Sequence, residues 1–195
     1  MTDDETTHAS ILAAAITVVA DVGYTSAPLS AIAAGAGVPE AVIEHQFQSK
    51  AMLMSEAAAW IFGDLAHYIA SRIEPEPAGL PRIQMYIRAM CNYYYENPRH
   101  LRALGAVLGS GELVGAAGHR TSTRRWQAVA EILGDGQREG RLGTFDPKAV
   151  AIVIGGGIDG LLTEWASDPS FDLPAAAEEL AGVMASLTQG AVFAP

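Results

Sequence analysis

Apolar residues recur at the spacing of an α-helix along most of the chain, and this pattern restricts the fold more than any other feature. Residues three and four apart share one face of a helix, so each stripe predicts an amphipathic helix. Glycine favours a helix end because it adopts left-handed backbone angles. The first stripe ends at Gly23 and a second, over 29–36, ends at Gly37. The members of the first stripe are Ile11, Leu12, Ala15, Val18, Val19 and Val22.

Proline and capping residues place the later helices. Pro39 suits the first turn of a third helix, and Ser49 suits the N-cap of a fourth that reaches Tyr68. The run 74–79, Glu-Pro-Glu-Pro-Ala-Gly, is typical of a linker. Further helices are expected over 83–94, from Asn97-Pro98, over 121–134, from Asp146-Pro147 to Asp168-Pro169, and from Leu173-Pro174 to about Leu187. Glycines 134, 136 and 140 are expected to loosen the chain, and the glycine-rich stretch 105–118 is left unassigned. No strand pattern and no repeat are evident, so the fold is expected to be all-α.

Composition and charge bound the class of protein. The chain has 195 residues, of which 50% are hydrophobic and 17% charged, as in a globular protein. Cys91 is the one cysteine, so no intramolecular disulfide forms and a reducing cytoplasm is expected. The acidic N-terminus has the wrong sign for a secretory signal. The longest uncharged apolar run, 149–158, is about half the ~20 residues of a membrane span, so we expect no membrane partner.

Residues 8–53 follow the order and spacing of a known DNA-binding unit. They resemble the tetracycline-repressor (TetR) family of transcriptional regulators. A looser match over 136–173 comprises Gln-Arg-Glu-Gly-Arg, Asp-Pro, an apolar helix with Ile-Asp-Gly-Leu, and a second Asp-Pro. The residues that carry the first match are Ile11-Leu12, Ala14-Ala15, Gly23-Tyr24, Ile32-Ala33, Ala36-Gly37-Val38, Phe47, Ser49-Lys50 and Leu53.

The resemblance implies two domains and a ligand-responsive transcriptional regulator, expected to be a repressor. Residues 1–48 would form a three-helix helix-turn-helix domain that binds DNA. Residues 49–195 would form a larger helical domain for ligand binding and dimerisation. The family forms homodimers, in which a bound small molecule changes the separation of the two DNA-reading heads. No cofactor or metal is implied, and no arrangement of residues names a reaction, so an enzyme is the less favoured reading.

The resemblance places a recognition helix at residues 40–46, and this part of the chain has few of the residues with which the family contacts phosphate. The residues expected to face DNA are Glu40, Ala41, Glu44, His45, Gln46 and Lys50. Glutamate can accept from cytosine N4, and glutamine can read adenine. The family usually has tyrosine at Glu44, and serine or threonine at Ala27, Pro28 and Pro39.

The charge of this region conflicts with DNA binding. Residues 1–71 contain one lysine, no arginine and eight carboxylates, a formal charge of −7 with neutral histidines. DNA affinity depends largely on cations that neutralise phosphates. Three interpretations stay open. The first is a regulator that binds duplex DNA, and the second is a TetR-fold protein that has lost DNA binding and uses its C-terminal cavity as a small-molecule binder or enzyme. The third is a protein whose acidic head binds a basic partner, or a heterodimer subunit that disables a true regulator.

Aromatic and methionine side chains are expected to line a pocket for a small hydrophobic or aromatic ligand. Tyr93, Tyr94 and Tyr95 point in different directions on a helix, so not all of them can be core. The expected lining residues are Trp60, Met85, Tyr86, Met90, Tyr93, Tyr94, Trp126 and Trp165.

Gly155, Gly157 and Gly160 spell Gly-x-Gly-x-x-Gly after a short apolar run. A nucleotide-binding loop would need a βαβ unit, and no second strand is evident, so we favour a helix with a small-residue face. The resemblance implies that this helix packs against its symmetry mate. The expected dimer interface is Ile154, Gly157, Ile158 and Leu161.

Overall fold

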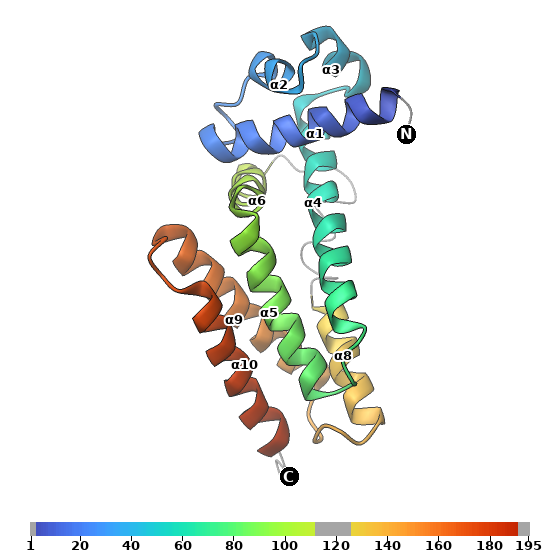
Figure 1. Cartoon of the computed structure of the whole chain (residues 1–195), viewed down its shortest axis with the longest axis vertical. Coiled ribbons are helices and arrows are strands. Elements are labelled where there is room, and N and C mark those ends of the chain that lie inside the picture. The colour runs from blue at the N-terminus through green and yellow to red at the C-terminus, as the bar shows by residue number, and fades with distance from the viewer. Residues whose placement is uncertain (1–2, 112–125, 191–195) are drawn as a thin grey trace. The chain divides into compact units, whose positions relative to one another are not determined.

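The computed structural model describes residues 3–111 and 126–190, and this part of the chain is helical without a β-strand. The expected all-α fold is confirmed. In chain order the helices are α1 (Asp3–Val22), α2 (Leu29–Ala36), α3 (Glu40–Gln46), α4 (Lys50–Ile73), α5 (Leu80–Glu96), α6 (Pro98–Ser110), α8 (Gln127–Arg138), α9 (Pro147–Ser167) and α10 (Leu173–Gly190) (Figure 1).

The chain divides into two compact units, and the division cuts through α4. The first unit contains residues 1–64 and 97–120, and the second contains residues 65–96 and 121–195. The expected functional boundary at residue 48 falls inside the first unit. That boundary lies between two expected functions and does not coincide with the limits of the compact units, and it remains a prediction.

In the first unit, α1 packs against both α2 and α6. Small residues allow α1 and α2 to approach closely, since a Cβ built on Gly35 would lie 3.3 Å from the Cβ of Ala14. Ile11, Ile32 and Ile43 supply one fully buried side chain each from α1, α2 and α3. These three helices therefore share one apolar core, which fixes the orientation of α3.

The turn between α2 and α3 depends on the left-handed backbone of Gly37, whose φ is 70°. The N–H of Val38 donates to the carbonyl of Ala33 at 3.0 Å, and the N–H of Gly37 donates to that of Ala34 at 3.3 Å. This closes the C-terminus of α2 as glycine commonly does. Pro39 then precedes α3 with φ −62° and ψ 145°. A three-residue turn joining two short helices is the geometry of a helix-turn-helix.

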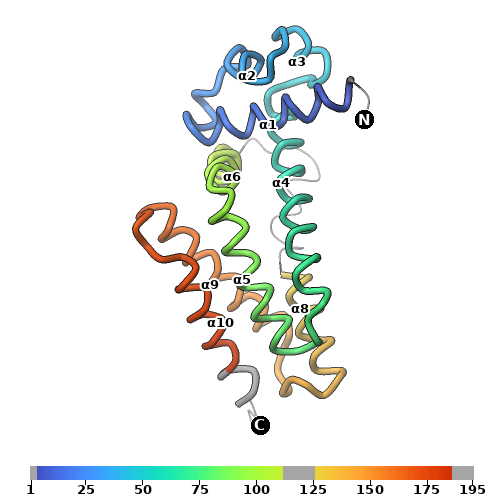
Figure 2. Tube along the Cα trace, in the orientation of Figure 1, coloured from blue at the N-terminus to red at the C-terminus, as the bar shows by residue number. Residues whose placement is uncertain are grey.

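In the second unit, α10 lies alongside α5 and α9, and α8 packs against α9 and α5 (Figure 2). Ile83, Ile87, Leu133, Ile154 and Ile158 are among its largest fully buried aliphatic side chains. Arg88 of α5 donates from Nε and an Nη to the two carboxylate oxygens of Glu178 on α10, at 2.7 and 2.8 Å. The unit is therefore a helical bundle with an aliphatic core.

Two of the differences from the expected helix boundaries have a physical reason in the structure. Helix α1 begins at Asp3, before its apolar stripe, because acidic residues in a first turn interact favourably with the helix dipole. The expected loosening at Gly134 and Gly136 is wrong, since α8 continues to Arg138. A Cβ on Gly136 would lie 2.6 Å from Leu142 Cδ1 and 2.9 Å from Gly79 Cα, so this glycine serves close packing. Of the helix expected over 121–134 and the unassigned stretch 105–118, residues 112–125 lie outside the described part.

Helix α9 is long and apolar enough to cross a membrane by length and composition, with a mean hydropathy of 1.4 over its most apolar window. A core helix of a bundle passes the same test. One face of α9 does belong to the core, because Ala151, Ile154, Gly155, Ile158 and Leu162 are buried. Its hydropathy therefore reflects a helix with apolar residues on two faces.

Candidate nucleic-acid interface

Helix α3 presents most of the residues expected to face DNA on one surface. Glu40, Ala41, Glu44 and His45 are exposed, whereas Ile43 is buried and anchors the helix. No side chain caps the first turn of α3, and Glu40 lies in that turn. The exposed face of α3 thus carries two carboxylates and one histidine, and its assignment to base contact remains a prediction.

Lys50, the one lysine or arginine in residues 1–71, is held by the loop between α1 and α2. Its Nζ donates to the carbonyl of Tyr24 at 2.5 Å and lies 4.8 Å from the centre of the Tyr24 ring. Burial lowers the pKa of the Lys50 ammonium. An ammonium has three donors, so the hydrogen bond to Tyr24 leaves two of them for other acceptors. The expected phosphate contact remains a prediction, with Tyr24 as a competitor.

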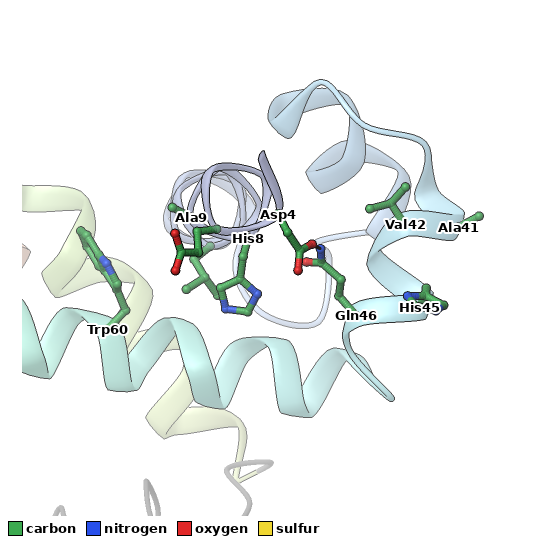
Figure 3. Close-up of a pocket in the computed structure, with 10 residues that line it drawn as sticks. Asp4, His8, Ala9, Ala41, Val42, His45, Gln46 and Trp60 are labelled. Atoms are coloured by element: carbon green, nitrogen blue, oxygen red, sulfur yellow. Dashed lines mark hydrogen bonds between the residues drawn. The ribbon is translucent and has the colours of Figure 1, made fainter. Parts of the chain in front are cut away.

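A groove of about 830 Å³ lies beside the recognition helix, within the first unit. Figure 3 shows Trp60 at one end and Ala41 and His45 at the other, with Asp4 and His8 between them. Two carboxylates and two histidines line it, together with one glutamine and apolar side chains. The lining residues are Asp4, Glu5, His8, Ala9 and Leu12 of α1, Ala41, Val42, His45 and Gln46 of α3, and Trp60 of α4.

Residues that line this groove make contacts between α1, α3 and α4. The side-chain amide of Gln46 donates from Nε2 to Asp4 Oδ1 at 3.1 Å, while its Oε1 is buried and has no hydrogen-bond partner in the described part of the chain. His8 Nε2 lies 3.3 Å from Glu56 Oε2, and the His8 ring stacks on Phe47 with centroids 5.1 Å apart. Gln46, expected to be a base reader, is therefore tied to the first turn of α1.

Trp60 belongs to the first unit, whereas the other residues expected to line a ligand pocket belong to the second. Its side chain is 44% exposed and meets the ring of His100 edge-on, with centroids 5.6 Å apart. Burial lowers the pKa of His100, and the charge of Asp64 opposes that change. Trp60 thus contributes to the groove beside α3.

The remaining expected lining residues lie in the second unit. Tyr93 and Tyr94 are buried and Tyr95 is 50% exposed, so the three tyrosines do divide between core and surface. The Tyr93 ring meets those of Tyr68 and Tyr94 edge-on, at 5.3 and 5.2 Å. Met85, Tyr86 and Met90 of α5 are half-buried, as are Trp126 and Trp165. Tyr93 and Tyr94 belong to a packed aromatic cluster, and the ligand-binding assignment remains a prediction.

The expected dimer interface on α9 needs correction at Ile154 and Ile158. Both side chains are at most 1% exposed and lie in the core of their own unit. The six-membered ring of Trp126 occupies the place where a Cβ on Gly155 would lie, and this contact turns the 154–155 face inward. Gly157 and Leu161 are half-buried. The outward apolar side chains of α9 are Ile152 and Val153, 45% and 57% exposed.

Sequence reasoning missed the residues that hold the candidate DNA-reading residues in place. Asp4, Tyr24 and Glu56 are far along the chain from Gln46, Lys50 and His8, which they contact. Asp4 and Glu56 belong to no motif, and the family match at Tyr24 does not indicate its contact with Lys50, so no sequence signal points to these pairs. Only the folded arrangement of α1, α3 and α4 brings them together.

Comparisons with known proteins agree with this architecture. Residues 11–57 match the family model for bacterial regulatory proteins of the tetR family. The transcriptional regulator FadR from Bacillus subtilis, solved in complex with stearoyl-CoA, has a TM-score of 0.81 at 20% identity, covering 91% of this chain and 97% of FadR. The fatty acid degradation regulator FadR from Bacillus halodurans has a TM-score of 0.79 at 20% identity, covering 91% and 93%.

A transcriptional regulator from Rhodococcus sp. Rha1 has a TM-score of 0.77 at 19% identity, covering 96% of this chain and 99% of the regulator. No curated protein matches the chain. At these identities the structural likeness establishes the fold. The helix-turn-helix, with its exposed second helix, and the helical bundle that follows it along the chain define the class of protein. The chain carries the N-terminal domain of the tetR family of bacterial regulatory proteins and has the fold of those regulators.

Proposed function

We propose that this protein is a ligand-responsive transcriptional regulator that binds duplex DNA through α3 and represses transcription. The observation that carries the proposal is the helix-turn-helix geometry, with its Gly37 turn and the exposed face of α3, inside the segment matched by the tetR model. Ala41, His45 and Gln46 would face base edges, and Lys50 would contact phosphate.

Backbone amides support DNA binding where cationic side chains are missing. Pro28 precedes α2 and no side chain caps that helix. The N–H groups of a first helical turn point away from the helix and can donate to phosphate oxygens. In our proposal the N-terminus of α2 takes over part of the positioning role that serine or threonine has in the family. The affinity would then be lower and its salt dependence shallower than in a basic head, since fewer counterions are released.

We also propose that the second unit binds a small hydrophobic or aromatic ligand. The half-buried side chains of Met85, Tyr86 and Met90 on α5, with Trp126 and Trp165, would contact it. The Bacillus subtilis FadR structure with stearoyl-CoA supports a ligand with a long apolar part, because that protein shares the fold. Quenching of the fluorescence of Trp126 and Trp165 by fatty acyl compounds, in a Trp60→Phe background, would test the proposal. Unchanged emission with every apolar compound tried would contradict it.

A homodimer is proposed on the outward faces of α9 and α10. Ile152 and Val153 of α9 and Val183 of α10 are 45%, 57% and 53% exposed, which is unusual for large aliphatic side chains. A second copy would cover them and place two heads on one duplex. Sedimentation should give a dimer for the wild type and a monomer for Val153→Asp, and Leu108→Asp is the matched control because Leu108 is an exposed aliphatic residue of the first unit. A monomeric wild type would refute the proposal.

The alternative is a protein that keeps the fold, has lost DNA binding, and acts in the cytoplasm as a ligand carrier or enzyme. The charge of −7 over residues 1–71 and the engagement of Lys50 by Tyr24 favour it. Footprinting on the DNA upstream of its own gene separates the two. A protected site of about two adjacent half-sites is expected for the regulator, and the absence of protection at low salt would favour the alternative.

A further inference from the structure

The first turn of α1 reaches the recognition helix through one hydrogen bond. Gln46 Nε2 donates to Asp4 Oδ1 at 3.1 Å, joining residues 42 positions apart. Figure 3 shows the two side chains pointing toward one another at the groove beside α3. The other end of the same amide, Oε1, is buried and has no partner in the described residues.

This conformation prevents Gln46 from reading a base. Glutamine recognises adenine with both ends of its amide, accepting from N6 at Oε1 and donating to N7 from Nε2. Here Asp4 takes one of the two Nε2 hydrogens and burial hides Oε1, so the amide cannot pair with adenine at both ends. A buried acceptor without a partner costs free energy, so the contact with Asp4 stabilises a conformation that is otherwise unfavourable.

We propose that Asp4 is a positioning residue that controls base reading by holding Gln46 away from the DNA. Gln46 reads adenine only after it leaves Asp4. When Gln46 leaves, the Asp4 carboxylate beside α3 loses its hydrogen-bond partner, and its negative charge repels the phosphates of DNA. This inference rests on the proposed DNA-binding function, and it makes the N-terminal turn of α1 a determinant of sequence preference as well as of affinity.

The test compares Asp4→Ala with Asp3→Ala, which removes the same charge from the neighbouring position of α1. Each variant is mixed with a pool of random duplexes at low salt, the affinity is measured, and the bound fraction is sequenced. Asp4→Ala should bind about threefold more tightly than Asp3→Ala, as expected for one exposed hydrogen bond to a charged group. It should also enrich adenine at one position of the site.

A Gln46→Ala background should abolish the difference in base preference, because Asp4 affects base reading only through Gln46. Equal affinity and equal base preference for the Asp4 and Asp3 variants would refute the inference and leave the proposed function intact. Absence of DNA binding by all variants would overturn both together.

A measurement without DNA tests the contact itself. In a ¹H–¹⁵N correlation spectrum, the side-chain amide signal of Gln46 is identified by its loss in Gln46→Ala. Asp4→Ala should shift that signal and Asp3→Ala should leave it in place. If Asp4→Ala leaves the Gln46 amide signal unshifted, in a spectrum otherwise like that of the wild type, the contact is contradicted and the inference with it.

Discussion

Replacing Gly155 with alanine is expected to destabilise the second unit, although alanine is the better helix former. The added methyl group would occupy the position of the Trp126 ring, so the ring must leave its place against α9. Overpacking of this kind costs about 1–3 kcal/mol, and the gain in helix propensity returns about 0.8–1 kcal/mol. We take the net loss in unfolding free energy to be about 1–2 kcal/mol, because the obstacle is a rigid ring.

Thermal unfolding at fixed protein concentration measures this effect. For a chain of this length the loss corresponds to a fall in Tm of about 2–8 °C. Gly105→Ala is the matched control, since Gly105 lies inside α6 with nothing within 4 Å of an added Cβ. The control should raise the stability by about 0.8–1 kcal/mol. The reasoning is refuted if the two substitutions shift Tm in the same direction by similar amounts.

Two further outcomes follow from the second unit. The hydrogen bonds from Arg88 lower the pKa of the Glu178 carboxyl below its ordinary value of 4.5. The ion pair therefore stabilises the folded protein fully above pH 4.5, and this contribution is lost as the pH falls through the lowered pKa. Urea unfolding should show Glu178→Gln less stable than the wild type by at most about 1 kcal/mol at pH 7. An equal difference in unfolding free energy between the two proteins at pH 2 would contradict this. Burial raises the pKa of the Cys91 thiol to about 12, so at pH 8 a thiol reagent should label it only as the protein unfolds, and rapid stoichiometric labelling of the folded protein would show the burial to be wrong.

The helical fold could be predicted because its determinants are local. Apolar stripes, Gly37 and Pro39 each act within a few residues, and the structure forms α2, the turn and α3 where these signals lie. The start of α1 was missed because its first turns are polar, so the apolar stripe gives no sign of them. Gly134 and Gly136 wrongly indicated a break in the helix. The packing of Gly136 against Leu142 depends on the tertiary fold, so nothing in the sequence indicates it.

The candidate site was less predictable because pairs distant in sequence determine it. The exposed residues of α3 follow from helical spacing, but the hydrogen bonds from Lys50 to Tyr24 and from Gln46 to Asp4 depend on how α1 crosses the other helices. The phase of α9 was wrong for a similar reason. The expected interface included Ile154 and Ile158, but both are buried on the side of α9 where Gly155 meets Trp126, and Val153 lies outside.

The central claim is that an acidic head with this geometry still binds DNA. It is tested most directly by measuring the affinity of the purified protein for random duplex DNA at about 50 mM salt and then at increasing salt, because electrostatic affinity is strongest at low ionic strength. The account predicts measurable binding that weakens as salt increases, with Lys50→Ala weaker than the wild type. No detectable binding at the lowest salt, by a folded protein, would contradict the account.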